Sequence, residues 1–334
     1  MLQPEAQTLL EALQPLVEPE MGWLLRLPNH EDGGELYPFV WEASKQGEFN
    51  LWSLIQSEGW SQTATLEAAL ESWSLPDRSG TVNGETWLLP SGDQAGILLD
   101  AAAKKVRLEH YRSLIDWLEA NLQHLQAFRL SCTSEPDADP YAAVMVVGQA
   151  AEVWLSVAPS VPHATPERDF PFQAGSVTAS PQPAPALEPQ LQISLDQLDQ
   201  ILAQLGTIQV YGYYGGGYDQ VHDHKLVYAT GISQTAAIEQ VLQIAGGTET
   251  RAFDHFKPKA DSAFERQPIE NLDQFLHRSF SQLRLDRICC WNREHFYISG
   301  ECDSGKGISG ECDPGRQAGD RIGVVLRSRF TYNP

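Results

Sequence analysis

The sequence lacks the features that mark membrane and secreted proteins. No apolar run approaches the roughly 18 residues that a membrane-spanning helix needs, so we expect no membrane insertion. The first residues, MLQPEAQTLLEAL, contain neither the basic segment nor the continuous apolar segment of a secretory signal. The 334 residues include only five cysteines, an odd number without regular spacing, which is more typical of a reducing compartment than of a disulfide framework. These absences predict a cytoplasmic location.

Basic residues are also few. The 23 Lys and Arg residues are outnumbered by 44 Asp and Glu residues, which gives a formal net charge of −21 at pH 7. Such a charge repels phosphate backbones and argues against direct nucleic-acid binding, whereas it attracts a basic protein partner. The acidity can equally serve solubility alone, and both interpretations remain open.

The common catalytic motifs are missing as well. The chain contains no Gly-x-Ser-x-Gly, no Cys-x-x-Cys and no His-Glu-x-x-His, and the glycines at 215–217 lack the Lys-Ser/Thr that follows a phosphate-binding turn. We therefore expect a protein that is not an enzyme, with no catalytic residues, no metal and no cofactor. Catalytic groups can be dispersed in sequence, so a metal or redox enzyme stays the last of three hypotheses.

A change of composition divides the chain. Residues 160–191 are dense in Pro, Ala and Ser and show no sustained periodicity, which predicts a semi-rigid extended tether. This linker separates a first module, residues 1–159, from a second module, residues 192–334. Phe170 and Phe172 lie within it and are interpreted either as loosely packed linker aromatics or as a docking patch.

The first module alternates helical and strand-like patterns. Leu9, Leu13 and Leu16 recur at three- and four-residue steps and predict an opening helix, and a wide apolar stripe at 3.6-residue period predicts a long helix over 105–126. A further helix is expected after Ser61. The other predicted elements are strands at 22–27, 37–43 and 48–55, a hairpin of 86–90 with 96–100, and three closing strands, AFRLSC, AAVMVVG and EVWLSVA.

The second module repeats this order of helices and strands. SQTATLEAALES at 61–72 is similar to SQTAAIEQVLQI at 233–244, which indicates an internal duplication. The predicted fold is α+β, with two related layered α/β sandwich modules and mostly antiparallel sheets. Near the end, ISGECDSGKG is followed at once by ISGECDPGRQ, and this tandem copy at 298–317 is interpreted as a surface loop between two strands.

Several segments of the first module resemble the nuclease A inhibitor family. The opening helix is followed by MGWLLRL and then by ELYPFVWEAS, which is similar to the Tyr-Pro-Phe strand of the family. HYRSLIDWLEANLQHLQAFRL at 110–130 resembles its penultimate helix and next strand, and VMVVGQAAEVWLSVAP resembles its closing hairpin. The second module is similar to the same template more faintly, in FLHRSFSQLRLDRI and in the strands around the duplicated loop.

The resemblance implies a sandwich that binds a sugar-nonspecific nuclease and blocks its metal-containing active site. In the family, acidic loop residues near the Tyr-Pro-Phe strand approach that site, and carboxylates there can mimic phosphate. The matching partner-binding residues in this chain are Glu31, Asp32, Glu35, Tyr37 and Trp41. Gly33 and Gly34 stand where the family carries acidic or polar residues, and this module continues into a linker where single-domain members end.

The leading hypothesis is therefore a non-catalytic, acidic protein-binding protein whose partner is a basic nuclease. The alternative is an adapter or assembly factor that reuses the fold and binds a subunit of a larger complex. A tyrosine-rich segment around 215–217 is a second candidate partner-binding surface, because Tyr is favoured at interfaces, although a buried sheet face fits it equally. Its residues are Tyr211, Tyr213, Tyr214 and Tyr218.

Histidine and cysteine offer only weak metal signals. His222 and His224 alternate and could share one face of a strand, but a solvated face is the preferred interpretation because no third ligand is spaced nearby. Cys289 and Cys290 are adjacent, so they should point to opposite faces of a strand and chelate poorly together. Cys132 is interpreted as a small core residue.

Overall fold

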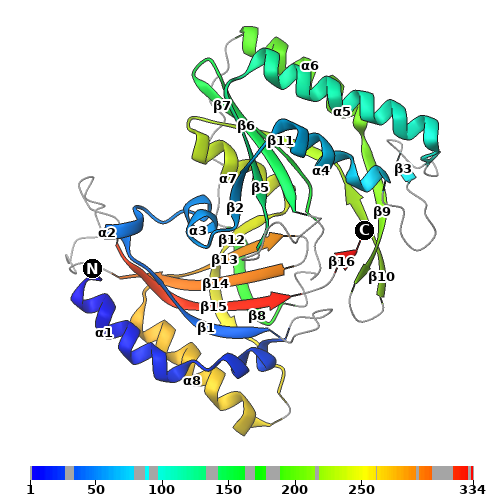
Figure 1. The fold of residues 1–334 in the computed structure, drawn as a ribbon. Coiled ribbons are helices and arrows are strands. Elements are labelled where there is room, and N and C mark those ends of the chain that lie inside the picture. Colours follow the sequence, from blue (N-terminus) through cyan, green and yellow to red (C-terminus); the bar gives the residue numbers. More distant parts are fainter. Residues whose placement is uncertain are drawn as a thin grey trace.

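The computed structural model (Figure 1) has the α+β fold that the sequence predicts. It describes residues 2–26, 34–78, 87–89, 97–132, 142–161, 170–177, 189–214, 218–260, 262–290, 293–302, 319–329 and 332–333. Every strand pair in these ranges is antiparallel. Two of these pairs, β12 with β8 and β5 with β6, contain register shifts. None of the helices in the same ranges is long and apolar enough to span a membrane.

Helices and strands alternate along the chain. The helices are α1 (Pro4–Leu13), the 3-10 helices η1 (Gln14–Leu16) and η2 (Pro19–Leu25), α2 (Ala43–Gln46), α3 (Leu51–Ser57), α4 (Leu66–Arg78), α5 (Ala101–Asn121), α6 (Pro189–Leu205), α7 (Gln234–Ala245) and α8 (Ala263–Ser279). The strands are β1 (Glu35–Trp41), β2 (Ser61–Ala64), β3 (Trp87–Leu89), β4 (Ile97–Leu98), β5 (Gln123–Leu130), β6 (Ala143–Ala150), β7 (Val153–Pro159), β8 (Phe172–Val177), β9 (Thr207–Tyr214), β10 (Tyr218–His224), β11 (Leu226–Gly231), β12 (Thr248–Phe256), β13 (Leu283–Cys290), β14 (Arg293–Glu301), β15 (Arg321–Arg329) and β16 (Tyr332–Asn333).

The larger sheet, sheet A, has the strand order β1-β15-β14-β13-β12-β8. Strands β12 to β15 follow one another along the second half of the chain, but the edge strand β1 comes from the first half. It pairs with β15 along its whole length, from Glu35 opposite Arg327 to Trp41 opposite Arg321. In Figure 1 this is the blue strand beside the red one.

Sheet B has the strand order β11-β7-β6-β5-β2 and reverses that arrangement. Four of its strands come from the first half, and its edge strand β11 comes from the second half. Strand β11 pairs with β7 from Leu226 opposite Pro159 to Gly231 opposite Trp154. Each sheet thus takes one edge strand from the other half of the chain, so the strand pairing crosses the expected boundary at 160–191.

A third sheet joins β10, β9, β3 and β4, with β16 on β9. It contains the predicted hairpin, in which Trp87 of β3 lies opposite Leu98 of β4. Strand β3 also pairs with β9, so this sheet too combines strands from both halves.

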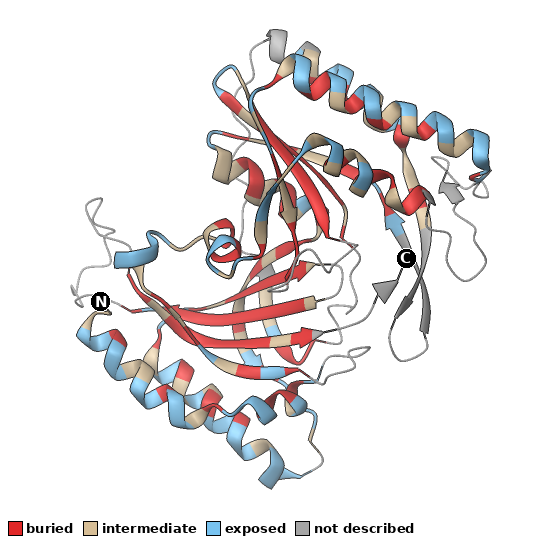
Figure 2. Ribbon diagram, in the orientation of Figure 1, coloured by how far each residue is buried: buried red, intermediate tan, exposed pale blue. Residues whose placement is uncertain are grey.

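The elements form layers, which Figure 1 shows from the side. Helices α1 and α8 cover the outer face of sheet A, α4, α5 and α6 cover the outer face of sheet B, and α3 and α7 lie between the sheets. Because side chains alternate along a strand, Phe296 and Ile298 of β14 pack toward α8 whereas Tyr297 packs between the sheets. Both sheets are consequently buried on two faces, as the red strands of Figure 2 show.

The two similar segments SQTATLEAALES and SQTAAIEQVLQI differ at their beginnings, although both continue as helices. Ser61–Ala64 forms β2 on the edge of β5, with Ser61 opposite Leu130. The matching Ser233 is instead the N-cap of α7, where its hydroxyl accepts a hydrogen bond from Ala236 N at 3.1 Å. When the strand orders of the two sheets are aligned from β1 and β11, β1 of sheet A takes the position of β11 of sheet B. Strand β12 of sheet A then takes the position of β2 of sheet B. Most of the duplicated loop at 298–317 lies outside the described residues.

Two predicted strands are helical. Residues 19–25, which overlap the strand predicted at 22–27, form η2, and the strand predicted at 48–55 is largely α3. Helix α3 begins because Asn50 caps it, accepting a hydrogen bond from Ser53 N at 2.7 Å. Glu239 of α7 accepts a second bond, from Trp52 N at 3.1 Å. Glu239 is 187 positions away from Trp52, so local periodicity cannot reveal this hydrogen bond.

The predicted tether contains a strand. Residues 172–177 form β8 at the edge of sheet A, beside β12. Phe170 and Phe172 are only 7% and 3% exposed, and their rings lie 5.3 and 4.8 Å from that of Phe296. The interpretation of these two residues as loosely packed linker aromatics is wrong, because they complete the core under α8.

A buried ionic cluster joins the three outer helices of sheet B. Arg107 of α5 donates from Nε to Asp77 Oδ2 of α4 at 2.7 Å, and from Nη2 to Tyr111 Oη at 3.0 Å. The same guanidinium also donates to the carbonyl oxygen of Leu205, the last residue of α6. Burial raises the pKa of Asp77, and Arg107 opposes that rise. The arginine therefore compensates an otherwise costly buried carboxylate.

Replacing Arg107 should destabilise the protein. In Arg107→Met the aliphatic stem remains but Asp77 loses its cation, so we expect a loss of about 3–5 kcal/mol of unfolding free energy. The measurement is urea denaturation at neutral pH. Lys45→Met, which removes the cation of the exposed pair with Glu42, is the matched control and should leave the urea midpoint unchanged. Equal midpoints for the two variants would contradict a stabilising role of the cluster.

Two histidines are buried and neutral. His295 of β14 is 3% exposed, and its ring stacks on Trp60 at 4.6 Å between centroids. Burial lowers the pKa of His295 to about 3 and that of His224 to about 4. Both pKa values lie below the ordinary value of 6.5, so between these pH values the unfolded chain binds more protons than the folded chain. The unfolding free energy therefore falls as the pH falls.

We expect the unfolding free energy to decrease from about pH 6.5 toward pH 4, by up to about 1.4 kcal/mol per pH unit for each of the two histidines. His295→Gln should reduce this slope, whatever it does to stability at neutral pH, because the group that titrates is gone. The readout is the urea midpoint measured across this pH range. His110→Gln, on the half-buried surface of α5, should keep the wild-type slope. An unchanged slope in His295→Gln would refute the assignment.

Candidate metal centre

Two elements of the sheet A layer bring three potential metal ligands together. Helix α8 begins with a capping box, in which Ser262 accepts from Glu265 N at 3.2 Å and Glu265 accepts from Ser262 N at 3.1 Å. Its apolar residues Ile269, Leu272 and Leu276 are fully buried against sheet A. This packing fixes the rotation of the helix, so the residues beside the apolar stripe face the end of β12.

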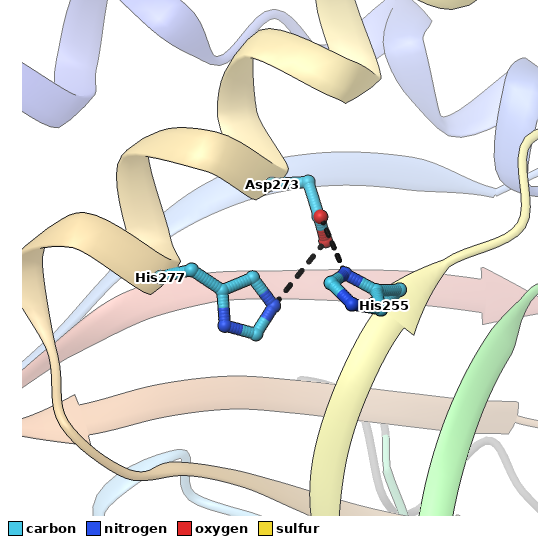
Figure 3. Close-up of side chains that lie close together, drawn as sticks. All are labelled: His255, Asp273 and His277. Atoms are coloured by element: carbon cyan, nitrogen blue, oxygen red, sulfur yellow. Dashed lines mark hydrogen bonds and ion pairs between the residues drawn. The ribbon is translucent and has the colours of Figure 1, made fainter.

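Asp273 and His277 occupy that flank, one helical turn apart. They are four residues apart in α8 and therefore lie on the same side of the helix. His255 is the next-to-last residue of β12 and approaches them from the sheet. Figure 3 shows the three side chains converging, with Asp273 between the two imidazole rings.

The distances within this cluster are short. His255 Nδ1 lies 2.8 Å from Asp273 Oδ2, and His277 Nε2 lies 3.8 Å from Asp273 Oδ1. One ligand atom from each of the three residues falls within 4.8 Å of the others. In a tetrahedral zinc site, bonds of about 2.0–2.2 Å place ligand atoms about 3.3 Å apart, so small side-chain movements would bring all three to one ion.

Hydrogen bonds to the backbone orient the ligands. Phe256 N donates to Asp273 Oδ1 at 3.2 Å, and His277 Nε2 lies 2.5 Å from the carbonyl oxygen of Asp254. The second contact makes Nε2 the protonated nitrogen of His277, because a carbonyl oxygen can only accept. A metal ion would replace this proton and this contact. The carboxylate, by comparison, keeps its backbone donor when it binds.

Aromatic contacts hold the two imidazole rings. The His255 and His277 rings lie 4.7 Å apart, and the His277 ring stacks on Phe253 at 6.1 Å with an interplanar angle of 17°. Phe253 itself is buried in the core under α8. The position of His277 is therefore supported from both sides, and His255 is held by His277 and by Asp273.

The cluster opens onto solvent. The side chains of His255, His277 and Asp273 are 61%, 35% and 17% exposed, respectively. Both histidines line an open groove of about 900 Å³ together with Phe253 and Phe280. An ion held here would have at least one coordination position facing the groove, as in metal sites that bind water or a small ligand.

The far part of the groove is polar. Arg284 and Arg321 line it, and each guanidinium is tied to the sheet. Arg284 Nε donates to Asp286 Oδ1 at 2.6 Å, and Arg321 Nε donates to Ser299 Oγ at 3.2 Å. Both arginines also lie over the Phe49 ring, on the face of sheet A opposite to α8.

The partner-binding residues predicted from sequence lie elsewhere. Glu35 is exposed at the start of β1, where Tyr37 donates a hydrogen bond to Glu35 Oε2 at 2.8 Å, which raises the pKa of Tyr37. Trp41 is 1% exposed and donates from its indole to Gly47 O at 2.9 Å, so it belongs to the core and not to that surface. Glu31 and Asp32 lie outside the described residues.

The tyrosine-rich segment forms the hairpin of β9 and β10, but its side chains lie outside the described residues. Its backbone pairs Tyr214 with Tyr218 and Tyr213 with Asp219, while Tyr211 pairs with Val221. His224, the last residue of β10, is 4% exposed and buried. The preferred interpretation of a solvated strand face is therefore wrong for His224.

Comparison of the chain with protein-family models, curated proteins and solved structures gives no match. The cluster of His255, Asp273 and His277 is thus defined by its geometry alone. Its only sequence signal is the spacing of Asp273 and His277, which puts two ligands on one side of a helix. The third ligand, His255, lies 18 residues before Asp273 on a different type of element, and only the packing of α8 on β12 joins them.

Proposed function

We propose that this chain binds a divalent transition-metal ion through His255, Asp273 and His277. The observation that supports this is the convergence of two imidazole nitrogens and one carboxylate oxygen within 4.8 Å at a solvent-accessible groove. The cluster combines β12 with α8, two elements that the core under α8 already holds in place. Binding would therefore require rearrangement of side chains alone.

The ligand set favours particular ions. Imidazole nitrogen suits Zn²⁺, Co²⁺, Ni²⁺ and Fe²⁺, whereas Ca²⁺ and Mg²⁺ prefer six or more oxygen ligands. Three protein ligands with an open position are typical of zinc sites that keep a water molecule. Two histidines and one carboxylate are also the ligands of non-haem iron sites with open positions. We propose Zn²⁺ or a similar ion as the physiological ligand.

Removing a ligand should weaken metal binding without unfolding the protein. We expect untagged, chelator-treated protein to bind one Zn²⁺ in isothermal titration calorimetry. His255→Gln, Asp273→Asn and His277→Gln should each lower the affinity by more than the roughly 10- to 100-fold that loss of an outer-shell partner costs. Titration with Co²⁺ provides an independent readout, because tetrahedral coordination gives visible absorption that hexaaqua Co²⁺ lacks.

His110→Gln is the control, since it removes a histidine from α5, a helix of the sheet B layer. It should bind Zn²⁺ as the wild type does. Unchanged affinity in all three ligand variants would place any bound ion at another site. No binding at all by folded wild-type protein would refute the proposal.

A second proposal is that the acidic chain binds a basic protein partner. Its support is the net charge of −21 together with Glu35 and Tyr37, which are accessible on the edge strand β1. The resemblance to nuclease A inhibitors makes a sugar-nonspecific nuclease the concrete partner, and a subunit of a larger complex is the alternative. Complementary charge would speed association and make it sensitive to salt.

A charge reversal can separate a specific surface from general acidity. Glu35→Arg and Glu119→Arg change the net charge equally, but Glu119 lies on α5 beyond sheet B. If the β1 edge binds the nuclease, Glu35→Arg should weaken inhibition of plasmid digestion at least about tenfold, a loss of about 1.4 kcal/mol of binding free energy. Glu119→Arg should retain inhibition. Full digestion in the presence of a large molar excess of wild-type protein would exclude that nuclease as the partner.

A further inference from the structure

Two cysteines meet where the two sheets come together. Cys132 lies two residues beyond the end of β5, in sheet B, and Cys290 is the last residue of β13, in sheet A. Both contribute to the core between the sheets, where the Cys132 and Cys290 thiols lie within hydrogen-bonding reach of one another. These residues are 158 positions apart in sequence, so only the packing of sheet A on sheet B makes them neighbours.

Contacts on both sides keep these cysteines together. Ser131 N donates to Trp60 O at 3.0 Å, and the Trp60 ring stacks on His295 with an interplanar angle of 17°. His295 in turn lies opposite Ile288 in the register of β14 with β13. Ile288 and Cys290 share one face of β13, because they are two residues apart. The backbone near Cys132 is thus fixed against the face of sheet A that carries Cys290.

The two thiols differ in accessibility. Cys132 is 3% exposed, whereas Cys290 is half-buried and lines a small apolar cavity with Leu130 and Ile288. Cys289 is 1% exposed and points to the opposite face of β13, so it does not compete for Cys132. An oxidant from solvent would therefore reach the Cys290 sulfur first.

We propose that Cys132 and Cys290 form a reversible disulfide that joins sheet B to sheet A when the protein meets a peroxide. The Cys290 thiol would reduce hydrogen peroxide, forming a sulfenic acid and releasing one water. The Cys132 sulfur then attacks the sulfenic sulfur, and the hydroxyl leaves as a second water with the Cys132 proton. Two thiols and one peroxide thus give one disulfide and two waters, and an added dithiol such as dithiothreitol reverses the bond by exchange.

Burial sets the rate of the second step. It raises the pKa of the Cys132 thiol well above its ordinary value, so the thiolate that attacks is scarce at neutral pH. Formation of the bond should therefore accelerate as the pH rises. A bond closing a loop of this length restricts the unfolded chain strongly, and we expect the oxidised protein to melt at least about 5 °C higher.

The test uses the full-length protein treated with hydrogen peroxide. Remaining free thiols are alkylated, the chain is digested without reduction, and cross-linked peptides are identified by mass spectrometry. We expect a peptide pair containing Cys132 and Cys290 that disappears on reduction, together with the rise in melting temperature. Cys290→Ser should abolish both effects. Cys132→Ser, which removes the buried thiol of the pair, should abolish them as well.

Cys302→Ser is the matched control, because Cys302 lies in the core under α8, away from the contact between the sheets. It should retain the cross-link and the rise in melting temperature. Recovery of Cys132 as a free thiol after complete oxidation of Cys290 would overturn the proposal. So would a cross-link in which Cys290 is joined to a residue other than Cys132, such as Cys289.

Discussion

The exchange of edge strands is the constraint on which the rest of the structure depends. Strand β1 can satisfy its backbone hydrogen bonds only beside β15, and β11 only beside β7, so neither sheet is complete without the other half of the chain. Helix α7 follows β11 directly, helix α3 follows β1 after the short helix α2, and both fill the space between the sheets. The two halves are consequently joined by main-chain bonds and by a shared core, and the connection through residues 160–191 is one link among several.

Polar groups buried in the core are stabilised chiefly by internal partners. The Arg107 cluster satisfies Asp77 between three helices, and Thr250 donates to Asp286 within sheet A at 2.6 Å. His295 remains neutral because burial disfavours its charged form. The paired groups make the core specific, since each needs a partner at one position, and the buried neutral histidine ties its stability to pH.

The two candidate chemical sites lie at opposite ends of one strand pair. Strands β12 and β13 are antiparallel, with Thr248 opposite Ile288, so the start of β12 lies near Cys290 and its end carries His255. At one end the open groove would give a borderline divalent cation access to nitrogen and oxygen ligands. At the other, the contact between the sheets places two thiols together. The His-Asp-His cluster connects β12 with helix α8, and the cysteine pair connects β13 with sheet B.

The sequence by itself determined the fold class, the long helix α5, the hairpin of β3 and β4, and the strong acidity, because periodicity, turn residues and charge are local properties. It failed where long-range partners decided the outcome. The α3 segment became helical with help from Glu239, and Phe172 entered sheet A through its pairing with β12. Asp273 and His277 have a helical spacing that the sequence shows, but none of the three clustered residues was predicted as a ligand. Only the tertiary structure could bring that strand end to the helix, because burial of Ile269, Leu272 and Leu276 sets the rotation of α8.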